Sequence, residues 1–271
     1  MIRQIDHLVI ISADLDTAIA NARTAGFTVV PGGTHGDGRT HNALIAFRDG
    51  TYIELIAPTS EDALQGDHRW FPRLRRGGGL VDFCLFGDKL DAEAAAIRER
   101  GVDYPAPNPM ARNRPDGVRL EWTLSTPPGA VGETGWPFLI EDITPRDLRV
   151  PHDANEITHQ NGAIGVAGVT VLVHDLDAAK RDYEAILGTT GREMTAPFSD
   201  DRLGVIFPVG EKSAQWVMLV EPNSHEATDH LEQHGQGPYR ALLRTREGAI
   251  APGEGDYLDP ELFSGARLLL A

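Results

Sequence analysis

Two titratable side chains stand inside stretches that are otherwise typical of buried strands. His7 lies within IDHLVII, and Glu54 lies within YIELIAP. Side chains alternate between the two faces of a strand, so His7 shares a face with Ile5 and Val9, and Glu54 shares one with Tyr52. If both faces line one cavity, an imidazole and a carboxylate converge there and can bind a divalent metal. The alternative for His7 is a core histidine that is hydrogen-bonded to a neighbour.

The glycine-rich loop THGDGRTHN carries further polar side chains. Loops on a rigid scaffold often hold functional residues. We interpret His35 as a catalytic base or a substrate contact, and Asn42 as an amide that fixes the loop or binds a carbonyl. A solvated loop is the alternative interpretation.

The segment ARNRPDGVRLEW and the strand after it suggest how a substrate could be held. Arg112 and Arg114 carry guanidinium forks that can bind a carboxylate or a phosphate. Trp122 and Phe138 could form an apolar wall around a ligand. The alternative is that the arginines only brace a turn.

A pair of histidines, His230 and His234, is spaced by four residues in SHEATDHLEQHG. This spacing on a helix can bind zinc, but the order His-Leu-Glu-Gln-His lacks the glutamate that follows the first histidine in metalloproteases. A solvated helix face is therefore expected here.

Composition limits the classes of function. The chain has 271 residues and a formal net charge of −15, which argues against a nucleic-acid partner, because phosphate backbones need a concentrated basic face. Cys84 is the only cysteine, so no intramolecular disulfide can form. The sequence shows neither a signal-peptide pattern nor an apolar run of membrane-spanning length. These features predict a cytoplasmic protein that binds a small molecule.

The elements that must position these residues repeat along the chain. Residues 5–11 form a predicted strand, and Asp14 can cap the amphipathic helix that follows. Three more predicted strands complete a β-α-β-β-β unit. The order begins again with Asp88 and again with Asp175 as the candidate helix caps, and a fourth unit near the C-terminus lacks its helix. We predict an α+β fold with a paired-module domain at 1–145, a polar linker at 146–161 and a degenerate half at 162–271.

The stretches IDHLVIISADLDTA, THGDGRTHNALIAFRDGTYIELIAP, PMARNRPDGVRLEW and WPFLIED resemble the glyoxalase-like domain family of the vicinal oxygen chelate superfamily. The resemblance implies paired modules whose sheets curl into a cup, often around a divalent metal such as zinc, manganese, iron or nickel; some members bind no metal. The superfamily includes isomerases, epimerases, ring-cleaving dioxygenases and proteins that only sequester a drug. Fold alone does not choose among these activities.

The resemblance assigns His7 to the metal-ligand position of the first strand and Glu54 to that of the last strand. In the second module, Asp82 matches His7 and would be a fourth ligand or a base, and Glu141 is the candidate that matches Glu54. In the third module, Gly168 and Met218 stand at these positions, so the C-terminal half is expected to be a structural lid or a homodimer surface.

The sequence therefore favours a metal-assisted isomerase or lyase that acts on a small oxygenated metabolite, which the arginines suggest is anionic. A non-catalytic binding or resistance protein is the alternative, and a dioxygenase is a third option.

Overall fold

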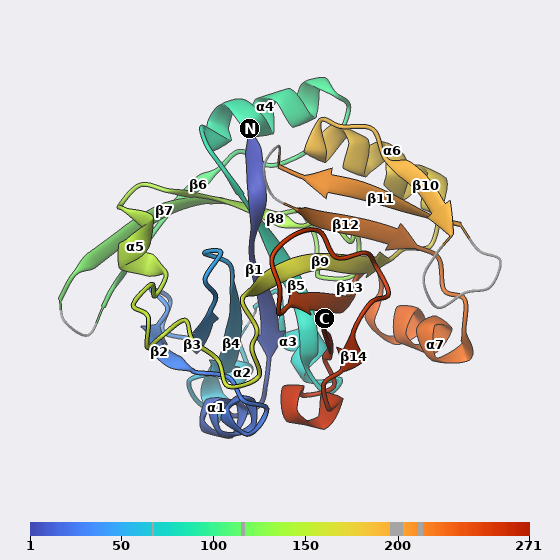
Figure 1. Cartoon of the computed structure of the whole chain (residues 1–271). Helices are drawn as coiled ribbons and strands as arrows, with labels where there is room; N and C mark the ends of the chain where they lie inside the picture. Colours follow the sequence, from blue (N-terminus) through green and yellow to red (C-terminus); the bar gives the residue numbers. More distant parts are fainter. Residues whose placement is uncertain (67, 115–116, 196–202, 211–213) are drawn as a thin grey trace.

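The computed structural model describes residues 1–66, 68–114, 117–195, 203–210 and 214–271. Their strands form two mixed sheets (Figure 1). The eight-stranded sheet has the order β2-β3-β4-β1-β5-β8-β7-β6, and the seven-stranded sheet has the order β10-β11-β12-β9-β13-β15-β14. The predicted α+β fold with repeated modules and curled sheets is confirmed.

The first sheet contains two β-α-β-β-β modules that meet at its centre, where β1 runs parallel to β4 and antiparallel to β5. The elements of this part are β1 (Ile2–Ile11), α1 (Leu15–Thr24), β2 (Val30–Thr34), β3 (Thr40–Ala46), β4 (Tyr52–Pro58), α2 (Glu61–Leu64), α3 (Phe71–Leu74), β5 (Gly79–Gly87), α4 (Leu90–Glu99), β6 (Asn108–Asn113), β7 (Arg119–Ser125) and β8 (Phe138–Asp142).

The second sheet repeats this plan with a reduced last module, in which β13 and β15 are joined without an α-helix in the described residues. After α5 (Arg146–Arg149), the elements are β9 (Gly165–Leu172), α6 (Leu176–Leu187), β10 (Arg192–Thr195), β11 (Leu203–Val209), β12 (Gln215–Val220), α7 (His225–His234), β13 (Gly237–Arg244), β14 (Asp256–Tyr257), the 3-10 helix η1 (Pro260–Phe263) and β15 (Arg267–Leu270).

Two of the three predicted helix caps are present. The Asp14 and Asp175 side chains accept the backbone N–H groups of Thr17 and Ala178, and so satisfy donors that a helix start leaves free. The prediction for Asp88 is wrong: the N-cap of α4 is Lys89, and Asp88 instead pairs with Arg3 at the surface.

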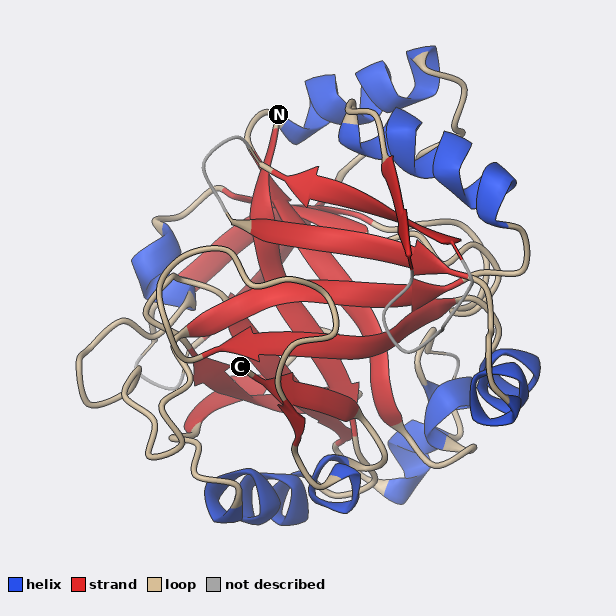
Figure 2. Cartoon of the chain, turned by 45° about the vertical axis from the view of Figure 1, so that its right-hand side comes forward, coloured by secondary structure: helices blue, strands red, loops and turns tan. Residues whose placement is uncertain are grey.

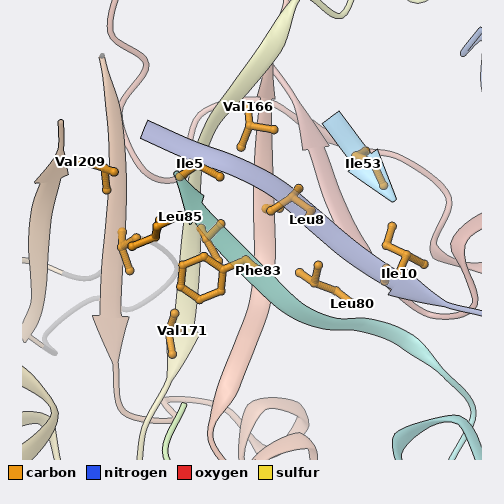
Figure 3. Packing of buried hydrophobic residues seen from close by; sticks show 14 of the residues in the cluster. Ile5, Leu8, Ile10, Ile53, Leu80, Phe83, Leu85, Val166, Val171 and Val209 are labelled. Carbon is orange, nitrogen blue, oxygen red and sulfur yellow. The ribbon is translucent and has the colours of Figure 1, made fainter. Parts of the chain in front are cut away.

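The two sheets share one hydrophobic core. Ile5, Leu8 and Phe83 from the first sheet pack with Val166 and Val171 from the second sheet (Figure 3). The strands of one sheet run across those of the other, and helices cover the outer edges (Figure 2). The cup side of the first sheet has a separate cluster around Val9, Trp122 and Phe138.

Residues 146–161, expected to be a linker, connect the two sheets and also pack into the first one. Arg149 is buried, and His159 is hydrogen-bonded through its two ring nitrogens to the Thr28 N–H and the Ala46 carbonyl. Polar composition predicted a linker here, whereas Arg149 and His159 are buried and held by specific partners.

In the part of the chain that the structure describes, no helix combines the length and the apolar character needed to cross a membrane.

Candidate functional site

A cavity of about 300 Å³ lies on the concave side of the first sheet. This volume is at the lower end of the range for small-molecule sites. The residues proposed from the sequence that line it are His7, His35, Asn42, Glu54, Arg112, Trp122 and Phe138. The structure therefore brings together residues from both modules around one space.

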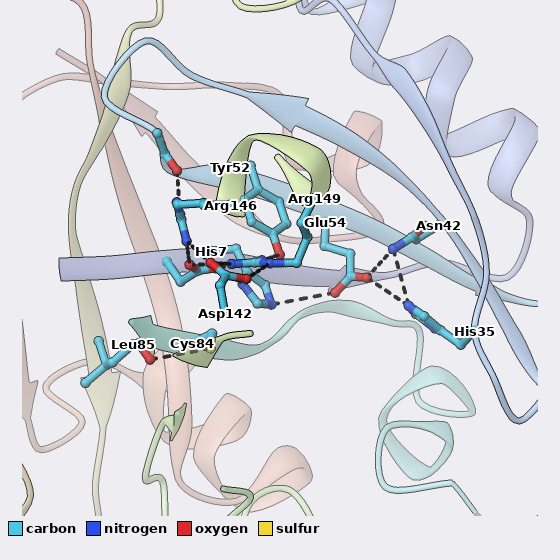
Figure 4. Close-up of polar contacts among 12 residues, drawn as sticks. His7, His35, Asn42, Tyr52, Glu54, Cys84, Leu85, Asp142, Arg146 and Arg149 are labelled. Atoms are coloured by element: carbon cyan, nitrogen blue, oxygen red, sulfur yellow. Dashed lines mark hydrogen bonds and ion pairs between the residues drawn. The ribbon is translucent and has the colours of Figure 1, made fainter. Parts of the chain in front are cut away.

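Glu54 forms the centre of the polar side of the cavity (Figure 4). One carboxylate oxygen accepts from the Asn42 amide and lies 3.3 Å from His35 Nε2, and the other oxygen lies 3.7 Å from His7 Nε2. Burial alone raises the pKa of Glu54, but the hydrogen bond and charge of His35, with the charge of His7 and the Asn42 amide, outweigh it and lower the pKa to about 2. Glu54 is therefore ionised at neutral pH.

His7 is held from behind by a second carboxylate. Its Nδ1 lies 2.6 Å from Asp6 Oδ1, and its ring stacks on Tyr52 with 4.5 Å between the ring centroids. Asp6 in turn pairs with Arg146 and Arg149. Since an ionised carboxylate only accepts, His7 donates through Nδ1–H and turns Nε2 toward Glu54.

This arrangement fits a divalent cation between His7 and Glu54. Metal-binding histidines usually donate their other ring N–H to a carboxylate, as His7 does to Asp6. Two ligand atoms that each lie about 2.1 Å from one ion are themselves about 3 to 4 Å apart. The 3.7 Å between His7 Nε2 and Glu54 Oε2 falls in that range.

The second module contributes no ligand beside them. Asp82 does not line the cavity, because its carboxylate accepts from Trp70 Nε1 at 3.0 Å and pairs with Arg69 at 2.9 Å. Burial raises the pKa of Asp82, against the opposing effect of Arg69. The carboxylate expected to be a fourth ligand or a base is thus already held by Arg69 and Trp70.

Glu141 also lies away from His7 and Glu54. Its two carboxylate oxygens accept the backbone N–H groups of Lys89 at 2.9 Å and Leu90 at 2.7 Å, so it caps α4. The sheet register explains the mismatch: β4 places Glu54 beside Val9.

In the second module, β8 places Phe138 beside Cys84, which matches Val9. Phe138, three residues before Glu141, therefore occupies the position that corresponds to Glu54. The sequence alignment of this strand was displaced by that distance.

The two arginines proposed from the sequence, Arg112 and Arg114, lie in different places. Arg112 lines the cavity and donates to the Gly32 carbonyl at 2.8 Å. Burial lowers the pKa of Arg112, and the charge of Glu54 opposes this shift. Arg114 instead lies over a neighbouring hollow, where it donates to the Leu148 carbonyl at 3.1 Å.

Sequence reasoning missed the support behind His7 and one wall of the cavity. Asp6 stands directly before His7, so the sequence could have indicated it as the carboxylate that orients His7. Arg146 and Arg149 were instead assigned to the linker. Arg69 and Trp70 belong to the basic run RWFPRLRR, in which the sequence offered no site residue. Both line the cavity, so that run forms part of the site.

Asp6, His7 and Cys84 form a second group whose potential ligand atoms lie within 4.8 Å of one another. Asp6 is already engaged by two guanidinium groups. Burial raises the pKa of the Cys84 thiol well above its ordinary value, so the thiolate that a metal needs is disfavoured. This group is therefore a poor cation site.

In the described residues of the second sheet, glycine and methionine stand at the positions that match His7 and Glu54. Met218 lies beside Thr170 in the register that places Glu54 beside Val9. A Cβ added to Gly168 would lie 2.2 Å from the Trp216 ring, so this indole fills the space next to the position that matches His7. The loss of a metal site in the third module stays a prediction.

Comparisons with known proteins agree with this architecture. A crystal structure of a hypothetical protein from Staphylococcus aureus matches with a TM-score of 0.70 and 12% identity over 98% of each chain. A mutant of 4-hydroxymandelate synthase from Streptomyces coelicolor matches with a TM-score of 0.61 and 14% identity, over 91% of this chain and 72% of that one. At these identities the matches support the fold alone.

A search of curated proteins found no significant match. The family model described as "Glyoxalase-like domain" matches residues 5–187, which include the whole cup and the first strand and helix of the second sheet. The chain therefore belongs to the glyoxalase-like domain family.

Proposed function

We propose that this protein is a metal-assisted isomerase or lyase that acts on a small oxygenated metabolite in the N-terminal cup. The observation that carries the proposal is the 3.7 Å approach of His7 Nε2 to the ionised Glu54 carboxylate, with Asp6 behind His7. His7 Nε2 and the Glu54 carboxylate face each other on the wall of one cavity, and a cation or a proton between two such electron-rich atoms is stabilising.

His7 and Glu54 would hold a divalent ion (zinc, manganese, iron or nickel), and the bound ion would supply Lewis acidity for a substrate carbonyl. His35 is fixed through Nδ1 to the Thr40 hydroxyl at 2.6 Å and can move a proton at the substrate through Nε2. Asn42 holds Glu54 in place, and Arg112 adds a positive charge that favours an anionic substrate. Trp122 and Phe138 exclude water from the remaining wall.

Metal content of the purified protein tests the proposal. Mass spectrometry should find one divalent ion per chain in the native protein, and this ion should be lost in His7→Ala and in Glu54→Gln. His225→Ala is the matched control, because its imidazole is 92% exposed on α7, and it should retain the ion. A native protein without metal after incubation with zinc, manganese and iron(II) would contradict the proposal. Redox-active iron would instead point to a ring-cleaving dioxygenase.

A specific observation supports non-catalytic ligand binding as the second candidate. Phe138 occupies the last-strand position of the second module, and Arg69 neutralises Asp82, so both positions of that module lack a free ligand. His7 and Glu54 would then pair with each other, and the aromatic wall would hold an apolar ligand. Native mass spectrometry of the metal-free protein should detect a retained small molecule if this candidate is right.

A further inference from the structure

A second hollow, of about 450 Å³, lies where the two halves of the chain meet. Its walls come from the end of α3 and the glycine run after it, from α7, and from the start of β15. It is separate from the cup and shares no lining residue with it. Three arginines line this hollow, namely Arg73, Arg76 and Arg267, together with His230 and His234.

The positive charge in this hollow is only partly neutralised. Arg267 pairs with Glu226 at 2.6 Å, and Arg76 donates to the Gln233 carbonyl at 2.6 Å. Asp229 lies 3.4 Å from His225. Among the described residues, neither Arg73 nor Arg76 forms an ion pair with a carboxylate.

Arg73 carries buried donors that have no acceptor. Its Nε and Nη1 atoms are inaccessible and make no hydrogen bond within the described part of the chain. Buried N–H groups without a partner cost free energy, and those of a charged group cost more. Burial, with the nearby charges of Arg267 and Arg76, lowers the pKa of Arg73 to about 10, so the guanidinium keeps its charge at neutral pH.

The two histidines face the same hollow as neutral donors. Burial, with the charge of Arg73 and further contributions from the neighbouring arginines, lowers the pKa of His230 to about 2 and that of His234 to about 4. His230 Nδ1 lies 3.3 Å from Arg267 Nη1 and accepts from it, which leaves the proton of His230 on Nε2. His234 Nδ1 is buried and also lacks a partner among the described residues.

These imidazoles are unsuited to a metal, because three guanidinium groups surround them and would repel a cation. An anion in the hollow would instead offset the charge of the arginines that line it. A planar carboxylate is saturated by one guanidinium fork, whereas donors from several elements match the oxygens of a tetrahedral group. We propose that Arg73, Arg76, His230 and His234 form a binding site for a phosphate group, either free or carried as a monoester on a metabolite.

Titration with inorganic phosphate at constant ionic strength, followed by NMR of the imidazole C–H signals, tests this site. We expect saturable shifts of the His230 and His234 signals in the native protein. Arg76→Gln changes an exposed side chain and should weaken phosphate binding about tenfold or more, as loss of one hydrogen bond to a charged group predicts. Arg73→Gln should do the same if it folds. His225→Ala, at the exposed start of the same helix, should bind phosphate normally.

Parallel titrations separate the ligand classes. Glycerol 3-phosphate that binds at least as tightly as inorganic phosphate would indicate a phosphorylated metabolite, and weaker binding would indicate free phosphate. Both results support the site. Three results would overturn it: no saturable shift in the folded native protein, equal binding in Arg76→Gln, or equal shifts with acetate or with chloride.

Discussion

At the residue scale, the unusual feature is a network of buried charges around Asp6, one member of which, Arg149, also lines the cup cavity. Asp6 is completely buried, and its carboxylate is paired with Arg146 and Arg149. Arg149 also donates to the Tyr52 hydroxyl at 2.8 Å and to Asp142, so every member has a partner. Such a network is costly to break, because removal of one charge leaves the others buried and uncompensated.

We therefore expect Asp6→Asn to lower the free energy of unfolding by about 3 to 5 kcal/mol. Urea unfolding of the native and variant proteins measures this. Asp88→Asn is the control, because Asp88 pairs with Arg3 at the surface and its loss should cost less than about 1 kcal/mol. If the two variants lost equal unfolding free energy, the buried charge network around Asp6 would contribute no more than a surface ion pair.

The same carboxylate predicts a pH dependence. Burial raises the pKa of Asp6, but Arg149 and Arg146 outweigh it, so the folded-state pKa lies well below the ordinary value. A depressed pKa means that the ionised form stabilises the fold above the unfolded-state pKa, and that this contribution is lost as the pH falls toward the folded-state value. The difference in unfolding free energy between the native protein and Asp6→Asn should be full at pH 7 and shrink below about pH 4. A constant difference between pH 7 and pH 3 would contradict this assignment.

At the element scale, Glu141 shows how a strand residue can serve a distant helix. Lys89, the N-cap of α4, has a positive φ of 54° and makes no side-chain cap, so Glu141 on β8 accepts the free N–H groups instead. Glu141→Gln should therefore lower the free energy of unfolding by about 1 kcal/mol. It should leave metal content unchanged, because Glu141 is not beside His7. Loss of metal in this variant would restore Glu141 to the ligand set.

Local patterns predicted the repeated elements because caps and alternation act within a few residues. Asp14 and Asp175 cap their helices as expected, and Glu54 lies on the predicted strand of the cavity wall. Side-chain partners that are distant in the sequence could not be predicted from local patterns. The roles of Glu141 and Asp82 depend on β8 register and on the placement of Trp70, and Arg149 reaches Asp6 from 143 residues away.

At the scale of the whole molecule, the two halves stabilise each other through their common core. Val166 and Val171 cover Leu8 and Phe83, and the Ile5 N–H donates to the Gln215 side chain at 2.8 Å. We expect a fragment of residues 1–161 to expose this apolar face and to aggregate or bind hydrophobic dyes. Static light scattering of the fragment beside the full chain measures this. A monodisperse fragment with native-like near-ultraviolet circular dichroism would show that the first half folds alone.

The indole over Gly168 has a consequence for what this scaffold could become. Trp216 packs in an apolar cluster with Met218, Leu242 and Leu269, and its Nε1–H donates to the Ile250 carbonyl at 2.8 Å. Trp216→Ala would remove about the volume of one bicyclic ring at a cost of about 3 to 5 kcal/mol, and voids with apolar walls can admit aromatic guests. Added indole would then act as a chemical rescue agent, and the second sheet would become a receptor for a foreign molecule.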